Sequence, residues 1–375
     1  MINVLLLGGG LQALCCGKSL NDLHYQVDAV TDDLQITKSK FFRKVYSNID
    51  SASNQIYSIL EKEKYDVLIP MVDMNVSFLS ENKQYIEEKF GCKCACVDYD
   101  LLKIVEDKHV FMEFCQNNGI PHPKTCVISE KCYTEAVNKV GFPALIKPDY
   151  SIGARGITRV NSVEELKNEF PKIKAVYGDC TLQQFIDNKE YYYNVMLYRN
   201  AEGKFLAHAI IKIVRMYPIN AGSSTCCISV EDNELLKICK DCLDKLNWVG
   251  MADFDVLQRL ENKEFKIIEI NARVPASLKG ATISGVNFPE VILKDLLNME
   301  IPKYNYQKGK IMRYLGTDIM WIIKSSNRFK SYPSWFHFIG DNIYYQDIYK
   351  EDFSTWWTWL AEGLKKLSKR NKRLR

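Results

Sequence analysis

Apolar runs alternate with amphipathic segments over the first 100 residues of the chain. The apolar runs are residues 2–7, 26–30 and 67–71, and the segments with helical spacing are 11–23 and 53–64. Strands that alternate with helices at this spacing predict a parallel sheet covered by helices. We therefore expect an open α/β domain over residues 1–100.

Short strands joined by tight turns replace this alternation in the middle of the chain. A helix predicted over 101–118 ends at Gly119, and Pro121 follows, which is typical of helix ends. The predicted hairpins pair 195–198 with 205–213 and 251–259 with 265–271, and further helices are predicted at 163–169 and 231–246. This α+β pattern predicts a second domain over 101–300, built on antiparallel strands.

The last 75 residues, 301–375, are rich in aromatic residues and end in a basic segment. Five of the six tryptophans lie between Trp321 and Trp359, and residues 365–375 carry seven basic and no acidic side chains. Ser354 is a candidate N-cap for a helix beginning near Thr355, whose apolar positions recur at helical spacing. This C-terminal extension has two interpretations: a helix docked on the rest of the chain with a solvated tail, or a basic amphipathic helix on a membrane surface.

Composition sets bounds on the kind of protein. The 375 residues are 47% hydrophobic and 26% charged with a net charge of +4, which is typical of a globular protein of two or three domains and gives no reason to expect nucleic acid as a partner. The N-terminus lacks the basic start of a signal peptide, and no uncharged run reaches the ~18 residues that span a bilayer. We therefore expect a cytoplasmic protein, held at the inner face of a membrane if the C-terminal helix binds lipid. The pattern predicts no oligomeric state.

The 13 cysteines are an odd number, which argues against a disulfide framework in a reducing compartment. Cys92, Cys94 and Cys96 alternate as on a strand, and Cys239 and Cys242 fall on the apolar stripe of a predicted helix. We expect these cysteines to be buried small hydrophobic residues rather than metal ligands.

The segment Glu269-Ile270-Asn271-Ala272-Arg273 combines a carboxylate, an amide oxygen and a guanidinium at the end of a predicted strand. Glu269 and Asn271 share one face of that strand because side chains alternate. If the preceding hairpin turn is centred on Asn262, Asp255 lies opposite Glu269 and Asp253 lies opposite Asn271. Hard divalent cations prefer such oxygens, so the register predicts a magnesium site beside a phosphate-binding arginine.

Two glycine-containing segments are candidate anion sites. Lys147 ends the predicted strand 144–148 and leads into the glycine loop 151–156, whose spacing differs from that of a P-loop. The pattern Gly8-x-Gly10-x-x-Ala13, with Asp28 downstream, is a partial dinucleotide fingerprint. A tight strand-to-helix turn accounts for this second pattern as well as a bound NAD does.

Taken in order along the chain, these segments resemble the ATP-grasp superfamily, especially its carboxylate–amine ligases and its carbamoyl-phosphate-synthase-like members. The resemblance covers about residues 1–300, with a Rossmann-like domain before a two-lobed ATP-grasp fold whose lid lobe would span about 120–187. The matching segments are Asp107-Lys108, 119–125, 142–148, 151–156, 182–191 and 269–273.

The resemblance implies a role for each matched residue. The positions implied for ATP are Lys108 and Lys147 at the phosphates, Ser151, Gly153, Ala154, Arg155 and Gly156 in the mobile loop, Gln184, Phe185 and Ile186 at the adenine, and Glu190 at the ribose. Asp255, Glu269 and Asn271 would hold one or two Mg²⁺ ions, with Mn²⁺ as the alternative ion, and Arg273 would contact the transferring phosphate. Gln184 stands where the family usually has Glu, and Asp255 where a longer Glu or Gln is common.

The implied reaction is an ATP-dependent ligation. The γ-phosphoryl group would pass to a small-molecule carboxylate, and an amine would then displace phosphate from the acylphosphate to form an amide. Arg273, Lys147 and Arg215 are the catalytic candidates, and Arg215 would clasp the acceptor carboxylate unless it belongs to a structural loop. The alternatives for the whole chain are an ATP-binding protein without catalysis and an NAD-linked oxidoreductase.

Overall fold

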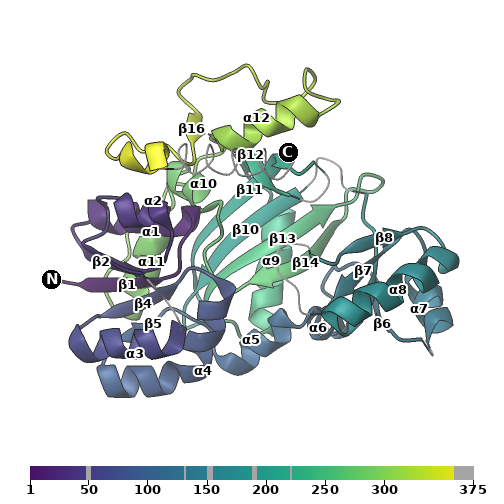
Figure 1. Ribbon diagram of the computed structural model, residues 1–375, viewed down its shortest axis with the longest axis horizontal. Helices are drawn as coiled ribbons and strands as arrows, with labels where there is room; N and C mark the ends of the chain where they lie inside the picture. Colours follow the sequence, from purple (N-terminus) through teal and green to yellow (C-terminus); the bar gives the residue numbers. More distant parts are fainter. Residues whose placement is uncertain (48–51, 131, 150–154, 188–191, 220–221, 359–375) are drawn as a thin grey trace, which may run out of the picture.

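The computed structural model describes residues 1–47, 52–130, 132–149, 155–187, 192–219 and 222–358. In this part of the chain the strands form three sheets. Figure 1 shows the N-terminal domain on the left, the large central sheet in the middle and a small lobe on the right. The predicted mixed α/β architecture with a parallel sheet is confirmed.

The N-terminal domain is an open parallel sheet with strand order β3-β2-β1-β4-β5. Helices pack on both faces, so β1 lies in the middle and Val4 to Leu7 are fully buried. The strands are β1 (Asn3–Leu7), β2 (Gln26–Val30), β3 (Lys44–Tyr46), β4 (Val67–Pro70) and β5 (Lys93–Cys94), and the helices are α1 (Leu11–Asp22), α2 (Leu34–Lys38), α3 (Ala52–Lys62) and α4 (Asp73–Phe90).

Two helices follow where one was predicted. They are α5 (Tyr99–Glu106) and α6 (Lys108–Asn117), and the chain breaks between them at Asp107. The Asp107 carboxylate accepts hydrogen bonds from the amides of His109 and Val110, so it caps α6. The single helix expected over 101–118 is therefore wrong, and the break sets Lys108 at the first position of a new helix.

The small lobe is a four-stranded antiparallel sheet with strand order β6-β9-β7-β8, backed by two helices. Its own core includes Ile146, Phe170 and Leu182. The elements are β6 (Thr125–Ile128), α7 (Tyr133–Val140), β7 (Ala144–Pro148), β8 (Thr158–Val160), α8 (Val163–Tyr177) and β9 (Cys180–Gln184). Helix α8 extends well beyond the predicted segment 163–169.

The large sheet has strand order β14-β13-β10-β11-β12-β15-β16. One of its faces packs on α5, α6 and α9, and the other shares a core with α10, α11 and the N-terminal domain. The elements are β10 (Tyr192–Arg199), β11 (Phe205–Tyr217), β12 (Ser223–Val230), α9 (Asn233–Lys245), β13 (Gly250–Gln258), β14 (Phe265–Asn271), α10 (Leu278–Ile283), α11 (Phe288–Leu296), β15 (Ile311–Arg313), α12 (Leu315–Lys324) and β16 (Ile343–Tyr345).

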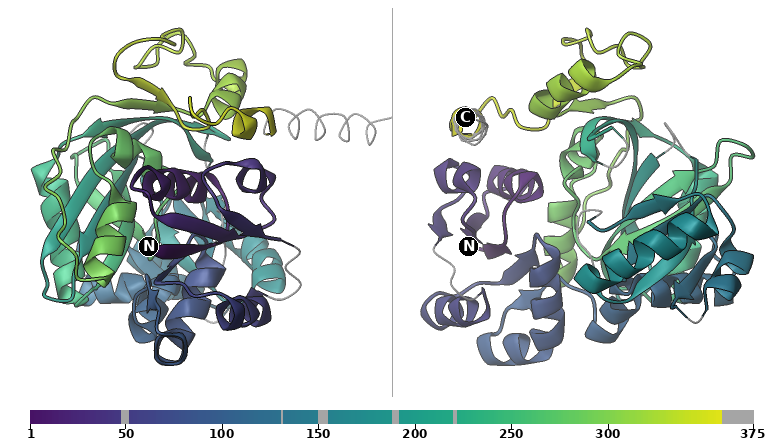
Figure 2. Two further views of the ribbon diagram at one scale, coloured as in Figure 1. Left: turned by 90° about the vertical axis from the view of Figure 1, so that its left-hand side faces the viewer. Right: turned by 45° about the vertical axis from the view of Figure 1, so that its right-hand side comes forward.

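The C-terminal residues contribute to this sheet. β15 pairs with β12 in antiparallel orientation and β16 pairs with β15 in parallel, so residues after 300 extend the edge of the large sheet. Helix α12 and the loop after it stand above that edge in Figures 1 and 2. The predicted basic helix from Thr355 begins within the described residues, but residues 359–375 lie outside them.

All 13 cysteines are free thiols. Cys92, Cys94, Cys96, Cys239 and Cys242 are buried in hydrophobic clusters, which confirms the expectation that they are core residues.

Candidate active site

The hairpin of β13 and β14 sets Asp255 opposite Glu269 and Asp253 opposite Asn271, as the register prediction required. Nearer the turn the pairing differs: Val256 pairs with Ile267, which leaves Ile268 as an extra residue. A β-bulge at this point absorbs the extra residue and changes the phase of the strand. The turn is therefore centred half a residue from Asn262, and the bulge restores the alignment of the site.

Burial and mutual repulsion disfavour the ionised form of Asp253 and Asp255 on this hairpin. Burial, followed by the charge of Glu269, raises the pKa of Asp255 from 3.8 to about 7. Burial also raises the pKa of Asp253, whose Oδ1 atom is buried without a hydrogen-bond partner among the described residues. A cation beside these oxygens would relieve both conditions, so the donor set fits a divalent ion.

The predicted metal-binding side chains include only two carboxylates. Within the described ranges, no three or more His, Cys, Asp and Glu side chains are grouped so that they could hold a metal ion. The predicted set has two carboxylates, Asp255 and Glu269, and one amide, Asn271. Because magnesium sites commonly use one or two carboxylates with substrate phosphates and water, this set agrees with an ion that arrives with a nucleotide.

Asn194 is a site residue that the sequence did not reveal. It lies on β10 opposite Asp255, and its Nδ2 atom donates a hydrogen bond of 2.5 Å to Asp255 Oδ1. The Ser277 hydroxyl lies 3.3 Å from Asn194 Oδ1 and completes a short chain of polar contacts. Asn194 therefore orients one of the two carboxylates.

Lys147 is buried at the end of β7 and approaches the same carboxylates. Its ammonium group donates a 3.0 Å hydrogen bond to Gln183 Oε1 on β9. Burial lowers its pKa to about 8, while the charges of Glu269 and Asp255 raise that pKa and the charge of Lys108 lowers it. The sequence-predicted residues Lys108, Lys147, Asp255 and Glu269 are thus electrostatic neighbours, although they come from three parts of the chain.

Arg273 reaches from the end of β14 to the N-terminal domain. Its Nε atom lies 2.5 Å and its Nη2 atom 3.3 Å from the two carboxylate oxygens of Asp73, the first residue of α4. Asp73 was not among the predicted residues. The pair joins the N-terminal domain to the edge of the candidate site and fixes the direction of the guanidinium.

Arg215 occupies a different place from the one expected. Its guanidinium is fully buried, forms a two-point ion pair with Asp318 at 2.8 and 3.0 Å, and donates to the Pro333 carbonyl. The carboxylate that Arg215 clasps is therefore one of this chain. These contacts favour the alternative interpretation, in which Arg215 belongs to a structural loop, over a role in binding an acceptor carboxylate.

The nucleotide-binding segments are only partly described. Ser151, Gly153, Ala154 and Glu190 lie outside the described residues, so the loop and ribose predictions stay predictions. Arg155 is exposed, and Gly156 has a φ of 75° with space for a Cβ limited to 2.8 Å by Pro148 and Tyr177. Only glycine fits that conformation comfortably.

The predicted adenine segment follows β9. The amides of Gln184 and Phe185 donate to the carbonyls of Lys124 and Pro143, and the Arg159 guanidinium lies over the Phe185 ring. Ile186 is buried. Any contact with adenine from this segment would therefore use its carbonyls or the amide of Ile186.

At the partial dinucleotide fingerprint, side chains of this chain occupy the positions where a dinucleotide would bind. Asp33 accepts a hydrogen bond from the Gly10 amide, at the end of α1 where a phosphate would bind. Asp28, the candidate ribose ligand, is buried in a two-point contact with Arg43 and also accepts from Tyr65. These contacts favour the structural turn over a bound NAD.

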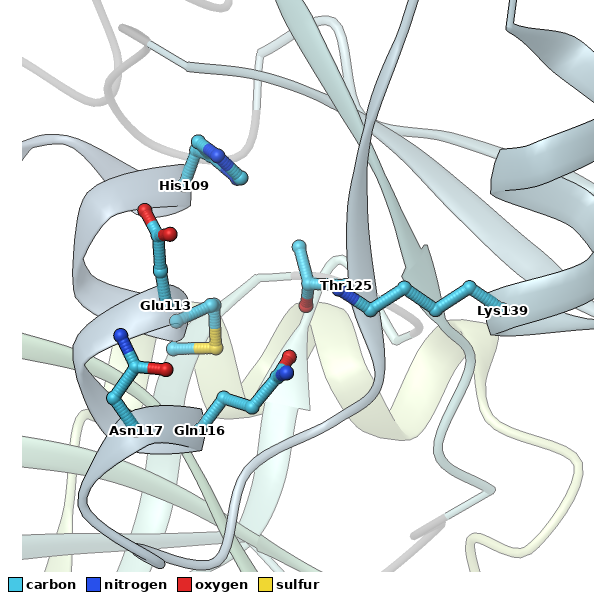
Figure 3. Close-up of a pocket in the computed structure, with 7 residues that line it drawn as sticks. His109, Glu113, Gln116, Asn117, Thr125 and Lys139 are labelled. Carbon is cyan, nitrogen blue, oxygen red and sulfur yellow. The ribbon is translucent and has the colours of Figure 1, made fainter.

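A small pocket lies away from these groups, between α6 and the small lobe. In Figure 3, His109, Glu113, Gln116 and Asn117 face Thr125 and Lys139 across the hollow. Its volume of about 80 Å³ is too small for a nucleotide. It contains none of the predicted metal or phosphate residues.

The predicted residues Lys147, Asp255 and Glu269 form a candidate site for charged ligands between the small lobe and the large sheet. In a comparison with known proteins, residues 105–277 match the ATP-grasp domain. The chain therefore contains an ATP-grasp domain, and the ATP-grasp resemblance recognised in the sequence is confirmed.

The chain is similar to curated ligases at low identity. It is 22% identical to the D-aspartate ligase of Enterococcus faecium over 78% of this chain and 76% of that protein. It is 20% identical to the mitochondrial arginine-specific carbamoyl phosphate synthase large chain of Schizosaccharomyces pombe over 76% of this chain, but only 25% of that larger protein.

Solved structures show the same fold. The biotin carboxylase of Campylobacter jejuni superposes with a TM-score of 0.70 at 16% identity, covering 82% of this chain and 74% of that one. The N5-carboxyaminoimidazole ribonucleotide synthetase of Thermotoga maritima superposes with a TM-score of 0.61 at 20% identity, covering 82% and 78%. At these identities the likeness supports the fold alone.

Proposed function

We propose that the protein is an ATP-dependent ligase that joins a carboxylate to an amine. The observation that carries the proposal is the register of β13 and β14, which aligns Asp255 with Glu269 on the sheet face that Lys147 approaches. The carboxylates of Asp255 and Glu269, the amide of Asn271 and the buried Lys147 suit a nucleoside triphosphate with its divalent ion.

The proposed reaction has two steps. A carboxylate oxygen of the acid attacks the γ-phosphorus of ATP, the bond to the β,γ-bridging oxygen breaks, and ADP leaves. The amine nitrogen then attacks the acyl carbon, phosphate leaves with one oxygen of the original carboxylate, and the nitrogen loses a proton to form the amide. Positioning and charge stabilisation account for this chemistry without a covalent nucleophile.

Each group has a distinct part in these steps. Lys108 and Lys147 hold the α- and β-phosphates, and Arg273, oriented by Asp73, contacts the transferring phosphoryl group. Asp255, Glu269 and Asn271 hold one or two Mg²⁺ ions. The bound ion supplies charge neutralisation at the phosphate oxygens.

The remaining predicted contacts belong to the same proposal. Glu190 binds the ribose, the segment 184–186 binds the adenine, and the loop from Ser151 to Gly156, with Gly153, Ala154 and Arg155, covers the phosphates and excludes water from the acylphosphate. The need for ATP supports a cytoplasmic location.

The names of the relatives guide the choice of substrates. The name of the D-aspartate ligase suggests amino acids for the first panel. We propose small-molecule carboxylates and amines as the substrate class, with D- and L-aspartate tested as both acid and amine.

A coupled assay of ADP release against this panel tests the function. The expected result is release that requires both an acid and an amine, with the amide detected by mass spectrometry. Glu269→Gln should abolish release, whereas Glu264→Gln, at an exposed site on the same hairpin, should not. Tight ATP binding with no ADP release under any pairing would instead favour the ATP-binding protein without catalysis.

A further inference from the structure

Helix α12 buries an acidic residue and exposes large apolar side chains. Its buried positions include Asp318, which is 0% exposed, and Trp321. Three of its exposed positions are apolar: Ile319 is 42% exposed, Met320 38% and Ile323 55%. A helix packed on a sheet normally shows the opposite pattern, so this surface needs an explanation.

The orientation of α12 is fixed by a buried ion cluster. Asp318 pairs with Arg215 on β11 and with Arg313 on β15, at distances of 2.7 to 3.0 Å. Rotating the helix to bury its isoleucines would separate these charges and leave two buried guanidinium groups without their carboxylate. The apolar face is therefore held toward solvent by specific contacts beneath it.

The loop at 325–340 continues this surface. The same two arginines hold the loop by its backbone, because Arg215 donates to the Pro333 carbonyl and Arg313 donates to the His337 carbonyl, each at 2.7 Å. The Trp335 indole donates to the carbonyl of Asp318. Around these anchors the loop exposes large side chains: Phe329 is 78% exposed, Tyr332 80%, Phe336 59% and Ile339 88%.

The exposed rings are organised. Phe329 and Phe336 stack with ring centroids 6.2 Å apart and planes within 7° of parallel, and Trp335 meets Phe336 edge to face. Figures 1 and 2 show α12 and this loop above the edge of the large sheet. We define the docking surface as the exposed side chains of residues 315–340.

The charges on the docking surface have one sign. Lys324, Arg328 and Lys330 stand among the apolar residues, and Asp318 is the sole acidic residue of 315–340. Since Asp318 is buried and paired, the docking surface presents cations and large apolar groups with no exposed anion. This combination is complementary to an anionic lipid interface, where rings and aliphatic chains enter the acyl boundary and lysines meet the headgroups.

We propose that the docking surface binds the face of an anionic lipid bilayer. Among the residues that the structure describes, no helix has the length and apolar character needed to cross a membrane, so the contact is with one face of the bilayer. The surface does not depend on the ligase chemistry, and it is separate from the predicted basic helix after Thr355.

A second copy of the chain fits the docking surface less well than an anionic bilayer does. A two-fold interface would set the cations Lys324, Arg328 and Lys330 of one copy against the same cations of the other. With no exposed carboxylate within 315–340 to pair with them, that contact would bring like charges together in a partly dehydrated interface. A bilayer supplies the missing negative charge.

Vesicle sedimentation with the full-length protein tests the proposal. We expect binding to vesicles of equimolar phosphatidylcholine and phosphatidylglycerol, and none to phosphatidylcholine alone. The triple variant Lys324→Ser/Arg328→Ser/Lys330→Ser should weaken binding about a hundredfold, at about fivefold per cation. Phe329→Ser/Tyr332→Ser/Phe336→Ser should weaken binding at least as much, while Val176→Ser, at a 73% exposed site on α8, should leave binding unchanged.

Two further measurements separate other occupants. Serine at the seven basic residues of 365–375 should leave most of the vesicle binding, and complete loss in that variant would overturn the docking surface. Sedimentation velocity should show the same mass for the wild type and both triple variants, and a dimer that these variants dissociate would assign the surface to a second copy. Equal vesicle binding by the wild type and the triple variants, or no binding by any of them, would also overturn the proposal.

Discussion

Replacing Glu269 by glutamine should make the ligand-free protein more stable and inactive at the same time. Asp255 and Glu269 lie opposite each other on the hairpin, and their like charges repel when no cation is present. Glutamine keeps the shape of the side chain and removes one of the charges. Groups that are arranged for a ligand commonly destabilise the empty protein in this way.

The pKa of Asp255 sets the size of the effect. A shift from 3.8 to about 7 corresponds to about 4 kcal/mol of unfavourable free energy for the ionised carboxylate. Burial is the larger cause and Glu269 the second, so the charge of Glu269 accounts for roughly 1–2 kcal/mol. Because the folded state holds this proton more tightly than the unfolded state does, the destabilisation is complete above pH 7 and declines as the pH falls from 7 toward 4.

Thermal unfolding at pH 8 measures this effect. Without nucleotide, Glu269→Gln should raise the Tm by about 1–3 °C, and the gain should shrink at pH 5. With magnesium and ADP the order should reverse, because the wild type gains binding free energy that the variant lacks. Glu264→Gln, the control on the same hairpin, should show neither the gain nor the loss of activity.

A lower Tm for ligand-free Glu269→Gln at pH 8 would refute the reasoning, because it would mean that Glu269 stabilises the fold through its charge. Turnover by this variant above a tenth of the wild-type rate would refute the metal assignment.

Three other perturbations test separate parts of the site and fold. Nucleotide affinity should fall about tenfold from pH 7 to pH 9, because Lys147, with a pKa of about 8, loses its proton over this range. Calorimetry on Lys147→Met should show weak nucleotide binding that does not change with pH. An equally steep pH dependence in this variant would exclude Lys147 as the titrating group. Asp73→Asn should lower kcat about tenfold with little change in the KM for ATP, because Arg273 loses its orientation, and an unchanged kcat would show that the pair is only structural. Asp318→Asn should reduce the free energy of unfolding, measured in urea, by about 3–5 kcal/mol, since Arg215 is left buried beside an uncharged partner. A loss below about 1 kcal/mol would show that the buried ion pairs of Asp318 do not stabilise the fold.

The register of the site could be predicted from local sequence because side chains alternate along a strand and a turn sets the pairing. The bulge could not be predicted in this way. Ile267, Ile268 and Ile270 are all apolar, so the change of phase between them leaves no mark in the pattern of hydrophobic and polar residues. The predicted residues still face each other because two offsets cancel. The turn is centred half a residue from Asn262, and the bulge at Ile268 shifts the pairing by half a residue in the other direction.

Contacts between distant segments account for the residues that were missed. Asn194 meets Asp255 through the pairing of β10 with β13, and Asp73 meets Arg273 across two domains, 200 residues apart in sequence. Arg215 was assigned to a substrate because its partner, Asp318, lies 103 residues away in a segment without a recognised motif. Residue type and spacing identify candidate groups, but only the tertiary fold shows which of them are already paired.

Transfer of labelled oxygen tests whether the reaction passes through an acylphosphate. With ATP, an amine and an acid that carries ¹⁸O in its carboxylate, the proposed acylphosphate requires one carboxylate oxygen to leave with the phosphate. ¹⁸O should therefore appear in the released phosphate in step with amide formation, and Glu269→Gln should release no labelled phosphate. Amide formation accompanied by unlabelled phosphate would contradict the proposed acylphosphate.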